Sequence, residues 1–394
     1  MGYTDQEGIL KTTDFQRVTA ALNLNPSFMD NHLTMNLNAK GMYAKTRYAE
    51  MAAISSAVFF DPTQSPYGFT SQYHKDLLGD KLDQTLRNFN GYFQWPVAAD
   101  YDKDTTWPYT VNGVASMPNP LSLLYGRNEH ANSRSFIGSA DIDYKVHGFE
   151  DLRLHLTLGA DVSEGKQYRN EQPWYPKSIY YGNWGDEKIL KRNLQLSTYA
   201  QYYHDFNDQL KNHVDVMAGY EWQHFWRDEK SDYCGYYPST SPRWIDPMSI
   251  NPETNMPYGN AVNERPHTPY HFRTDSYLVS FFGRANYSLL DRYMLTFTLR
   301  NDGSSRFKEH WALFPSLALA WKINEEPFLK NVEALSDLKL RLSYGKTGQQ
   351  AGAVPDYSWI ATYTKNKGTD SYYPVAGDGL LYRPDNYTPE LKWE

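Results

Sequence analysis

Hydrophobic and polar residues alternate with a period of two between positions 276 and 302. In SYLVSFFGRANYS (276–288), one face carries Tyr277, Val279, Phe281, Ala285 and Tyr287, and the other carries Ser280, Arg284 and Asn286. After the link LLDR, YMLTFTLRND places Tyr293, Leu295, Phe297 and Leu299 on one side, and Thr296, Thr298, Arg300 and Asp302 on the other. Such alternation predicts β-strands with one apolar and one polar face.

The same pattern returns in eight other segments of the chain. They are 18–25, 33–40, 136–146, 152–160, 194–202, 214–222, 311–323 and 338–345. The chain is therefore predicted to contain about ten strands of roughly ten residues each, which is the length of a tilted strand that crosses a membrane.

The predicted connections alternate between short and long. Short ones lie near 25–32, 147–150, 205–212, 288–292 and 324–336, and long ones near 43–134, 162–191, 225–274 and from 346 onward, with 303–310 as a shorter member of the long set. This alternation predicts an all-β fold, part of a large antiparallel up-and-down transmembrane barrel with turns at one end and loops at the other. A soluble Greek-key sandwich would not place every long connection at the same end.

Helices are predicted at only two places. One lies within 44–59, and the other lies within 324–337, where Asn324 can act as the N-cap with Glu325 and Glu326 in the first turn. The longest apolar stretch, 51–60, is about half the roughly 20 residues of a membrane-spanning helix. The first residues show neither the charged start nor the apolar core of a secretory signal.

Composition agrees with β-structure and argues against several partners. Aromatic residues make up 16% of the chain. Aromatic residues are enriched in β-strands and in the belts at membrane interfaces, so this share favours β-structure. The net charge of −7 argues against a nucleic-acid partner, which would require a basic face. The single cysteine, Cys234, allows no internal disulfide and no cysteine-cluster metal site.

The stretch Gly345-Lys346-Thr347 resembles the tail of a phosphate-binding loop, but the resemblance fails. The first glycine of that motif would fall at Leu340, inside an alternating strand, and no amphipathic helix follows. The 11 histidines show no metal-ligand spacing, and no nucleophile elbow is present. The carboxylate pairs Glu325/Glu326 and Asp100/Asp102 are of the kind that chance supplies among 46 acids, so we expect no catalytic residue, cofactor or metal.

Two groups of residues are candidates for contact with a ligand. The inward polar residues Arg284, Arg300, Arg306 and Arg341 either bind a ligand or face a polar lumen in which charges pair with one another, and the second interpretation is favoured. The tryptophans predicted in loops either stack on sugar faces or pack loop against loop, with packing slightly favoured; they are Trp95, Trp107, Trp174, Trp184, Trp226 and Trp244.

A run of motifs resembles the SusC/RagA-type TonB-dependent outer-membrane transporters. The matching stretches are Gly283–Tyr287, Arg300–Phe307, Phe314–Trp321, Glu325–Phe328 and Leu338–Gln349, in the family's order and spacing. The final YTPELKWE is similar to another family motif, with Thr388 where asparagine is usual. The segments EGILKTTDFQRVTAALNLNPSF and AVFFDPTQSPYGFT resemble the family's earlier strands and a following loop.

The resemblance implies a fold and a function. It implies about 10 of the 22 strands of a barrel, with short periplasmic turns and long extracellular loops. Residues 1–394 would form part of this barrel domain, without the plug, signal peptide or C-terminal strands. The implied function is import of oligosaccharides or peptides across the outer membrane, without catalysis. The implied partners are outer-membrane lipid, a SusD-like surface lipoprotein, and TonB, which would bind through an N-terminal region.

Two other functions stay open at this point. The first is a soluble, aromatic-rich carbohydrate-binding β-protein, against which the alternating connection lengths speak. The second is a glycan-degrading enzyme, against which the lack of a convergent catalytic set speaks.

Overall fold

The computed structural model describes twelve stretches of the chain. They are residues 1–93, 117–176, 181–206, 209–237, 243–329, 336–349, 356–366, 373–374, 381–385, 387–388, 390–391 and 393.

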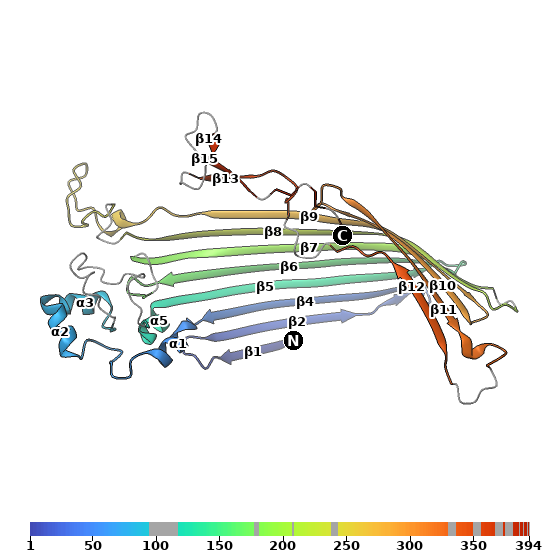
Figure 1. The fold of residues 1–394 in the computed structure, drawn as a ribbon, viewed down its shortest axis with the longest axis horizontal. Helices are drawn as coiled ribbons and strands as arrows, with labels where there is room; N and C mark the ends of the chain where they lie inside the picture. The colour runs from blue at the N-terminus through green and yellow to red at the C-terminus, as the bar shows by residue number, and fades with distance from the viewer. Residues whose placement is uncertain are drawn as a thin grey trace.

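Most of these residues belong to one large antiparallel sheet, in which the strands follow one another in chain order and the short β3 pairs with β4 alone (Figure 1). The strands are β1 (Gly2–Glu7), β2 (Asp14–Leu24), β3 (Ser27–Phe28), β4 (Leu33–Tyr48), β5 (Arg127–Lys145), β6 (Leu152–Glu171), β7 (Tyr181–Asp205), β8 (His213–Tyr236), β9 (Tyr270–Leu289), β10 (Tyr293–Ser304), β11 (Trp311–Lys322) and β12 (Lys339–Gly345). The sheet is open, with β1 at one edge and β12 at the other. This is the up-and-down order that the sequence predicts.

The connections lie at two different ends of the sheet. The segments 25–32, 146–151, 206–212 and 290–292 join strands at what we call the turn end. The longer segments 49–126, 172–180 and 237–269 join them at the loop end, as Figure 1 shows. At the turn end, positive φ angles at Met29, Asp30 and Asn31, and at Leu290 and Asp291, close the two tightest turns.

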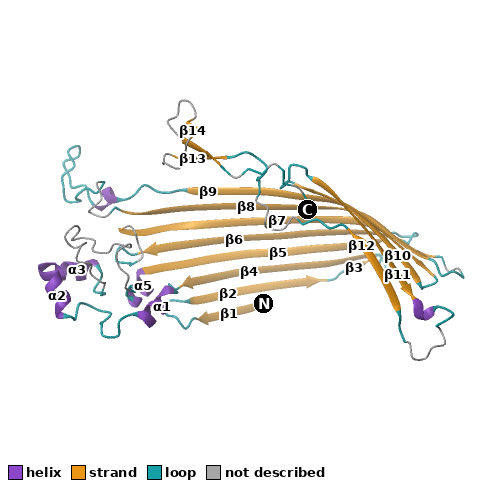
Figure 2. Cartoon of the chain, viewed as in Figure 1, coloured by secondary structure: helices purple, strands orange, loops and turns teal. Residues whose placement is uncertain are grey.

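Short helices gather at the loop end (Figure 2). They are α1 (Ala52–Phe59), α2 (Gln72–Leu78), α3 (Leu82–Asn88), α5 (Pro120–Gly126) and the 3-10 helices η1 (Gly79–Lys81) and η2 (Asn260–Asn263). A further 3-10 helix, η3 (Ile323–Glu325), lies at the turn end, and β13 (Tyr363–Asn366), β14 (Tyr373–Pro374) and β15 (Leu381–Pro384) form a separate small sheet.

Two buried apolar clusters lie among the helices and connections of the loop end. One buried cluster joins Ala53 of α1 to Leu123 and Leu124 of α5 and to Tyr175. A second joins Phe69, Leu78 and Phe93. The large sheet instead leaves rows of leucine, phenylalanine and tyrosine exposed, so its apolar face needs another medium to cover it.

No helix among the described residues is both long and apolar enough to cross a membrane.

All ten predicted strands are confirmed, but several are much longer than predicted. β7 has 25 residues and β8 has 24, and β1 was not predicted. Much of the predicted loops 162–191 and 225–274 is strand, because β6–β9 continue past their alternating segments.

The predicted helix within 44–59 is confirmed as α1. The helix predicted within 324–337 is wrong where the structure describes that range: only η3 forms, its N-cap is Lys322, and Asn324 lies inside it rather than capping it. Residues 330–335 lie outside the described residues.

Candidate functional site: a two-faced sheet with a cavity at its loop end

The strand register sorts the side chains of the sheet into two faces. Leu295 of β10 lies opposite Tyr287 of β9 and Leu319 of β11. One residue further, Thr296 lies opposite Asn286 and Ala318. Because residues opposite one another point to the same side of a sheet, the alternating rows form one apolar face and one polar face.

The apolar face changes character toward the loop end. On β5 it runs from Tyr144 to Phe136, close to the roughly 9–11 residues of a tilted strand that crosses a membrane. The next residue on that face is Arg134, whose Nη2 lies 2.9 Å from Oε1 of Glu164, and Lys188 Nζ lies 3.4 Å from Oε2 of the same carboxylate. This ion-paired row marks where the apolar belt ends.

The polar face is bridged by hydrogen bonds from strand to strand. Asn38 accepts a hydrogen bond at its Oδ1 from Asn23 Nδ2 at 2.5 Å. Farther along the sheet, the hydroxyl of Thr157 donates to Asp141 Oδ1 at 2.8 Å, and Gln201 Nε2 donates to Asp215 Oδ1 at 2.8 Å. Polar groups therefore satisfy one another across this face.

The predicted lumen arginines lie on the polar face by register. Arg300 donates from Nη2 to Glu221 Oε2 at 2.9 Å and from Nε to Asp302 Oδ1 at 2.7 Å. Arg284 Nη2 lies 3.8 Å from Asp215 Oδ2. Arg341 is exposed on the edge strand β12, opposite Ala320. Arg300 and Arg284 are thus placed beside neighbouring acids.

A cavity of about 540 Å³ lies where the polar face approaches the loop end. Strand residues Lys191, Phe225, Arg227 and Thr274 line it, together with Arg306, Asp356 and Tyr357 from the connections beyond β10 and β12. It therefore combines cations, hydrogen-bonding groups and aromatic rings.

The wall of this cavity is fastened by polar contacts. Arg306 Nε lies 2.8 Å from Asp356 Oδ1, and Arg227 pairs with Glu229. The Tyr357 hydroxyl accepts from the Asp275 amide at 2.8 Å and donates to its carbonyl at 3.0 Å. These contacts join the segment after β12 to the edge of β9.

Sequence reasoning missed most of this cavity. The sequence pattern indicates Arg306 as a candidate but predicts Lys191, Phe225 and Arg227 in loops. The signal that could have found them is strand phase, because Phe225 and Arg227 continue the odd-numbered polar face that includes Glu221.

A buried charge cluster fixes the helices of the loop end to β5. Arg127 Nη1 lies 2.8 Å from Glu50 Oε2, and its Nη2 pairs with Glu129. The hydroxyl of Tyr175 donates to Glu50 Oε2 at 2.8 Å. Burial, followed by this hydrogen bond, raises the pKa of Tyr175 far above its ordinary value.

The α5 helix beside this cluster begins at an N-cap. Asn119 accepts from the backbone amides of Leu121 at 2.9 Å and Ser122 at 3.2 Å, and Pro120 occupies the first helical position. The Asn-Pro pair is the signal by which the sequence could have predicted α5.

The candidate tryptophans are placed differently from one another. Trp174 packs against Tyr92 with ring centroids 5.2 Å apart, and Trp184, which is in β7 and not in a loop, packs against Tyr236 at 4.8 Å. Trp226, in β8 and not in a loop, borders the cavity but alternates with Phe225 and Arg227, so by register its ring lies on the opposite, apolar face, where the guanidinium carbons of Arg192 and Arg273 lie 5.0 and 5.5 Å from the ring centroid. Trp244 is partly exposed in the segment between β8 and β9, and Trp95 and Trp107 lie outside the described residues.

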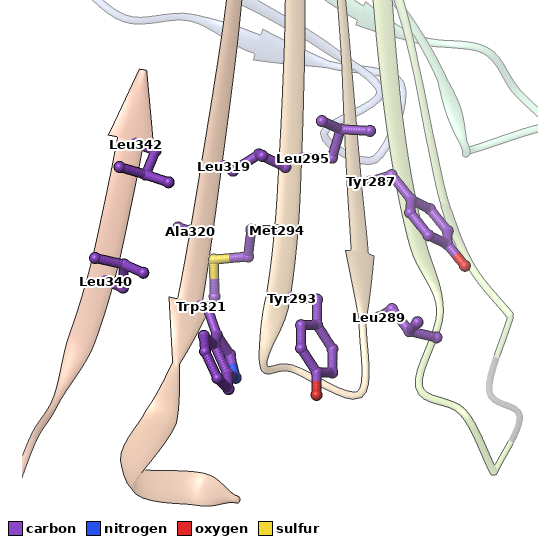
Figure 3. Close-up of a pocket in the computed structure, with 10 residues that line it drawn as sticks. All are labelled: Tyr287, Leu289, Tyr293, Met294, Leu295, Leu319, Ala320, Trp321, Leu340 and Leu342. Atoms are coloured by element: carbon purple, nitrogen blue, oxygen red, sulfur yellow. The ribbon is translucent and has the colours of Figure 1, made fainter.

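A second hollow, of about 550 Å³, lies near the turn end of β9–β12. Figure 3 shows the tyrosines at 287 and 293, Trp321 and leucines such as Leu340 around it. These side chains belong to the apolar face by register. The hollow is therefore a furrow of the exposed apolar belt.

Gly345, Lys346 and Thr347 lie at and just after the end of β12. Leu340 lies inside β12, which ends at Gly345, and the Lys346 amide donates to the Pro315 carbonyl at 3.0 Å. Of the two carboxylate pairs, Asp100 and Asp102 lie outside the described residues. Glu326 accepts from Tyr293 Oη at 2.6 Å and Trp321 Nε1 at 2.9 Å, so it anchors the turn.

Comparison with known proteins agrees with this architecture. The family model of the TonB dependent receptor-like β-barrel matches residues 79–394. TonB-dependent receptor SusC of Bacteroides thetaiotaomicron is 40% identical to the chain over 409 residues, and TonB-dependent receptor P26 of Formosa agariphila is 26% identical over 404 residues. Each alignment covers 100% of this chain but only 36% and 35% of the relative, so the chain spans about a third of their length.

The fold is also found among solved structures. The RagAB peptide importer in its closed-closed state matches with a TM-score of 0.66 and 20% sequence identity, over 99% of this chain and 38% of that one. At this identity the likeness concerns the fold.

The open sheet, its two faces and the family match lead to one conclusion. The chain belongs to the TonB-dependent receptor family of outer-membrane β-barrel proteins, and it forms part of the barrel.

Proposed function

We propose that this chain forms part of the wall of a transporter that imports oligosaccharides or peptides across the outer membrane. The observation that carries the proposal is the two-faced sheet. Its apolar face suits lipid, and its polar face, bridged by contacts such as Asn38 to Asn23 and Arg300 to Glu221, suits a water-filled lumen.

The remainder of the receptor would complete the barrel. Unpaired strand edges are not tolerated in lipid, and the edges here are β1 and β12. Because the curated relatives are almost three times as long as this chain, we propose that the remaining segments of the receptor supply the closing strands and a plug. TonB would act through that remainder, and a SusD-like lipoprotein would cover the loop end.

The cavity at the loop end is proposed as a ligand contact. Arg227, Lys191 and Tyr357 offer hydrogen bonds, and Phe225 and Phe272 offer ring faces. Both sugars and peptides bind through that combination. Of the candidate tryptophans, we propose ligand contact for Trp244, which is partly exposed in the segment between β8 and β9. The ring of Trp226 lies on the apolar face by register, and Trp174 and Trp184 already pack against tyrosines.

The ligand is proposed to cross without any bond being made or broken. Among the described residues, the acids near the cavity are paired with arginines, as Asp356 is with Arg306. A soluble carbohydrate-binding protein is disfavoured by the exposed apolar rows, which water would not cover without aggregation.

Uptake tests this proposal. Cells lacking the receptor are complemented with the wild type, Arg227→Gln or Arg134→Gln, and uptake of labelled oligosaccharide and peptide mixtures is measured. Both arginines pair with a glutamate, Glu229 and Glu164 respectively, but only Arg227 lines the cavity. We expect Arg227→Gln to lower uptake of one of the two mixtures and Arg134→Gln to leave it unchanged.

The same experiment can contradict the proposal. If deletion of the receptor changes uptake of neither mixture, the proposal that the receptor imports oligosaccharides or peptides is wrong. If purified receptor cleaves the oligosaccharides or the peptides, the proposal that the ligand crosses without bond cleavage is wrong. If Arg227→Gln and Arg134→Gln behave alike, the cavity is not the contact.

A further inference from the structure

A metal-ligating set of side chains lies at the base of the connection between β8 and β9. Cys234 Sγ, a Glu264 carboxylate oxygen and a ring nitrogen of His267 all lie within 4.8 Å of one another. Cys234 Sγ is 3.2 Å from Glu264 Oε1, and His267 Nε2 is 3.9 Å from the same oxygen. In a tetrahedral zinc site, bond lengths of about 2.0–2.3 Å separate neighbouring ligand atoms by roughly 3.3–3.6 Å. The Sγ–Oε1 separation is already close to this range, and His267, whose side chain is 59% exposed, would rotate to bring its Nε2 nearer to the other two atoms.

The orientation of His267 suits a metal ligand. Its Nδ1 lies 2.9 Å from Oδ2 of Asp232, a carboxylate that accepts a hydrogen bond from the imidazole tautomer protonated at Nδ1. The lone pair then resides on Nε2, the nitrogen that is nearer to Glu264. A carboxylate behind a histidine is the usual outer support of a zinc-binding imidazole.

The scaffold that holds these residues is formed by backbone contacts. Tyr236 and Glu264 form an isolated β-bridge. The Arg265 amide donates to the Gly235 carbonyl at 2.7 Å, and the Thr268 amide donates to the Tyr233 carbonyl at 3.0 Å. The segment that carries Glu264 and His267 is therefore already laid against the end of β8.

The surroundings limit which metal fits. Cys234 is 1% exposed, whereas Glu264 and His267 open to solvent on the other side, which leaves room for a water as the fourth ligand. A thiolate with an imidazole and one carboxylate suits zinc and disfavours calcium or magnesium, which prefer oxygen ligands throughout.

We propose that Cys234, Glu264 and His267 bind one Zn²⁺ ion, with Asp232 positioning His267. The thiol releases its proton to solvent as the sulfur–zinc bond forms, and no redox partner is needed. The ion would pin the 264–268 segment to β8 and so fix the base of the β8–β9 loop. The sequence predicted no metal site because one cysteine and scattered histidines show no ligand spacing; the hairpin brings residues thirty positions apart together. This inference does not depend on the transport proposal.

The test uses the complete receptor, purified in detergent and stripped with a chelator. Co²⁺ alone is added as a spectroscopic probe, then displaced by Zn²⁺, and bound metal is counted. We expect a thiolate-to-cobalt charge-transfer band in the wild type, lost in Cys234→Ser, together with one fewer zinc per chain. Asp232→Asn should weaken zinc binding by about 10–100-fold, as the loss of such outer support does. His271→Gln is the matched control, since His271 pairs with Asp228 near the same strand ends but lies outside the set.

Each outcome decides the matter. Absence of the cobalt band in the wild type, or equal zinc content in the wild type and Cys234→Ser, overturns the site. A band that survives both Glu264→Gln and His267→Ala overturns the assigned ligands. Those two residues are solvent-facing, so their variants remain informative even if Cys234→Ser fails to assemble, which heat-modifiable gel migration would reveal.

Discussion

At the residue scale, the positions that matter most are a few polar side chains that tie the connections to the sheet. Arg127 is enclosed by Glu50 and Glu129, whose side chains are 9% and 8% exposed. At the turn end, Glu326 accepts hydrogen bonds from Tyr293 and Trp321 and forms an ion pair with Arg292. The sequence identified Glu326 as a residue of a helix start, because a Glu-Glu pair after asparagine has that pattern. Its real role depends on Tyr293 and Trp321, which only the folded hairpin brings close.

Replacing Arg127 by methionine should loosen the attachment of α1 to β5. Two largely buried carboxylates would lose their shared cation, which typically costs about 3–5 kcal/mol. Hydrogen exchange of the backbone amides of α1 should then speed up by roughly 100-fold or more in the Arg127→Met receptor. Arg134→Met is the control: Arg134 is 68% exposed in its pair with Glu164, so its loss should change local stability by at most about 1 kcal/mol. Equal exchange in the two variants would contradict the role of the cluster.

Replacing Glu326 by glutamine should weaken the turn that follows β11 in a pH-dependent way. Hydrogen bonds from Tyr293 and Trp321 lower the pKa of Glu326 below its ordinary value of 4.5. The carboxylate therefore stabilises the folded state above pH 4.5, and this contribution is lost as the pH falls through the lowered pKa. The difference in proteolytic resistance of this turn between wild type and Glu326→Gln should be large at pH 7 and shrink as the pH falls below 4.5. Glu325→Gln should show no such difference, because Glu325 is 46% exposed and lies 3.7 Å from Lys322; a pH-independent gap for Glu326→Gln would contradict the assignment.

At the element scale, the alternation of apolar and polar residues predicted the membrane-crossing parts of the strands. It did not predict strand β1 or the loop-end halves of the long strands. Between Phe136 and Tyr144 the contrast between faces is strong because one face is apolar. Beyond Arg134 both faces of β5–β8 are polar, so the strands continue by backbone pairing without a hydrophobic period to reveal them. β1, with the sequence GYTDQE, was missed for the same reason. The cavity was missed as a consequence, because its strand residues lie in these outer halves.

A charge on the apolar face should impair assembly of the barrel. Leu317 of β11 lies on that face opposite Phe297, and arginine near the middle of a bilayer costs about 2–4 kcal/mol. Ser343→Arg is the matched control, because Ser343 lies on the polar face of the neighbouring strand, beside Arg341. Heat-modifiable migration of outer-membrane fractions should show less folded receptor for Leu317→Arg and an unchanged amount for Ser343→Arg. The reverse ranking would assign the two faces the other way round.

At the scale of the whole molecule, the chain is a curved, open segment of a barrel wall with two specialised ends. The turn end is closed by tight turns such as 290–292, and the loop end carries the helices, the charge cluster and the cavity. The order of short and long connections was enough to predict this plan from the sequence. Side-chain sites at the loop end were not, because they join residues far apart in the chain, as Arg306 and Asp356 are.

The central claim is that the apolar face meets lipid and the polar face meets water in the lumen. The most direct measurement places a nitroxide side chain at successive positions of β10 in the complete receptor, reconstituted in lipid bilayers. Accessibility to oxygen and to a water-soluble nickel complex is then compared along the strand. We expect high oxygen accessibility at Leu295, Phe297 and Leu299, and higher nickel accessibility at Thr296, Thr298 and Arg300. Accessibility without a two-residue period, or with the two faces exchanged, would contradict the account.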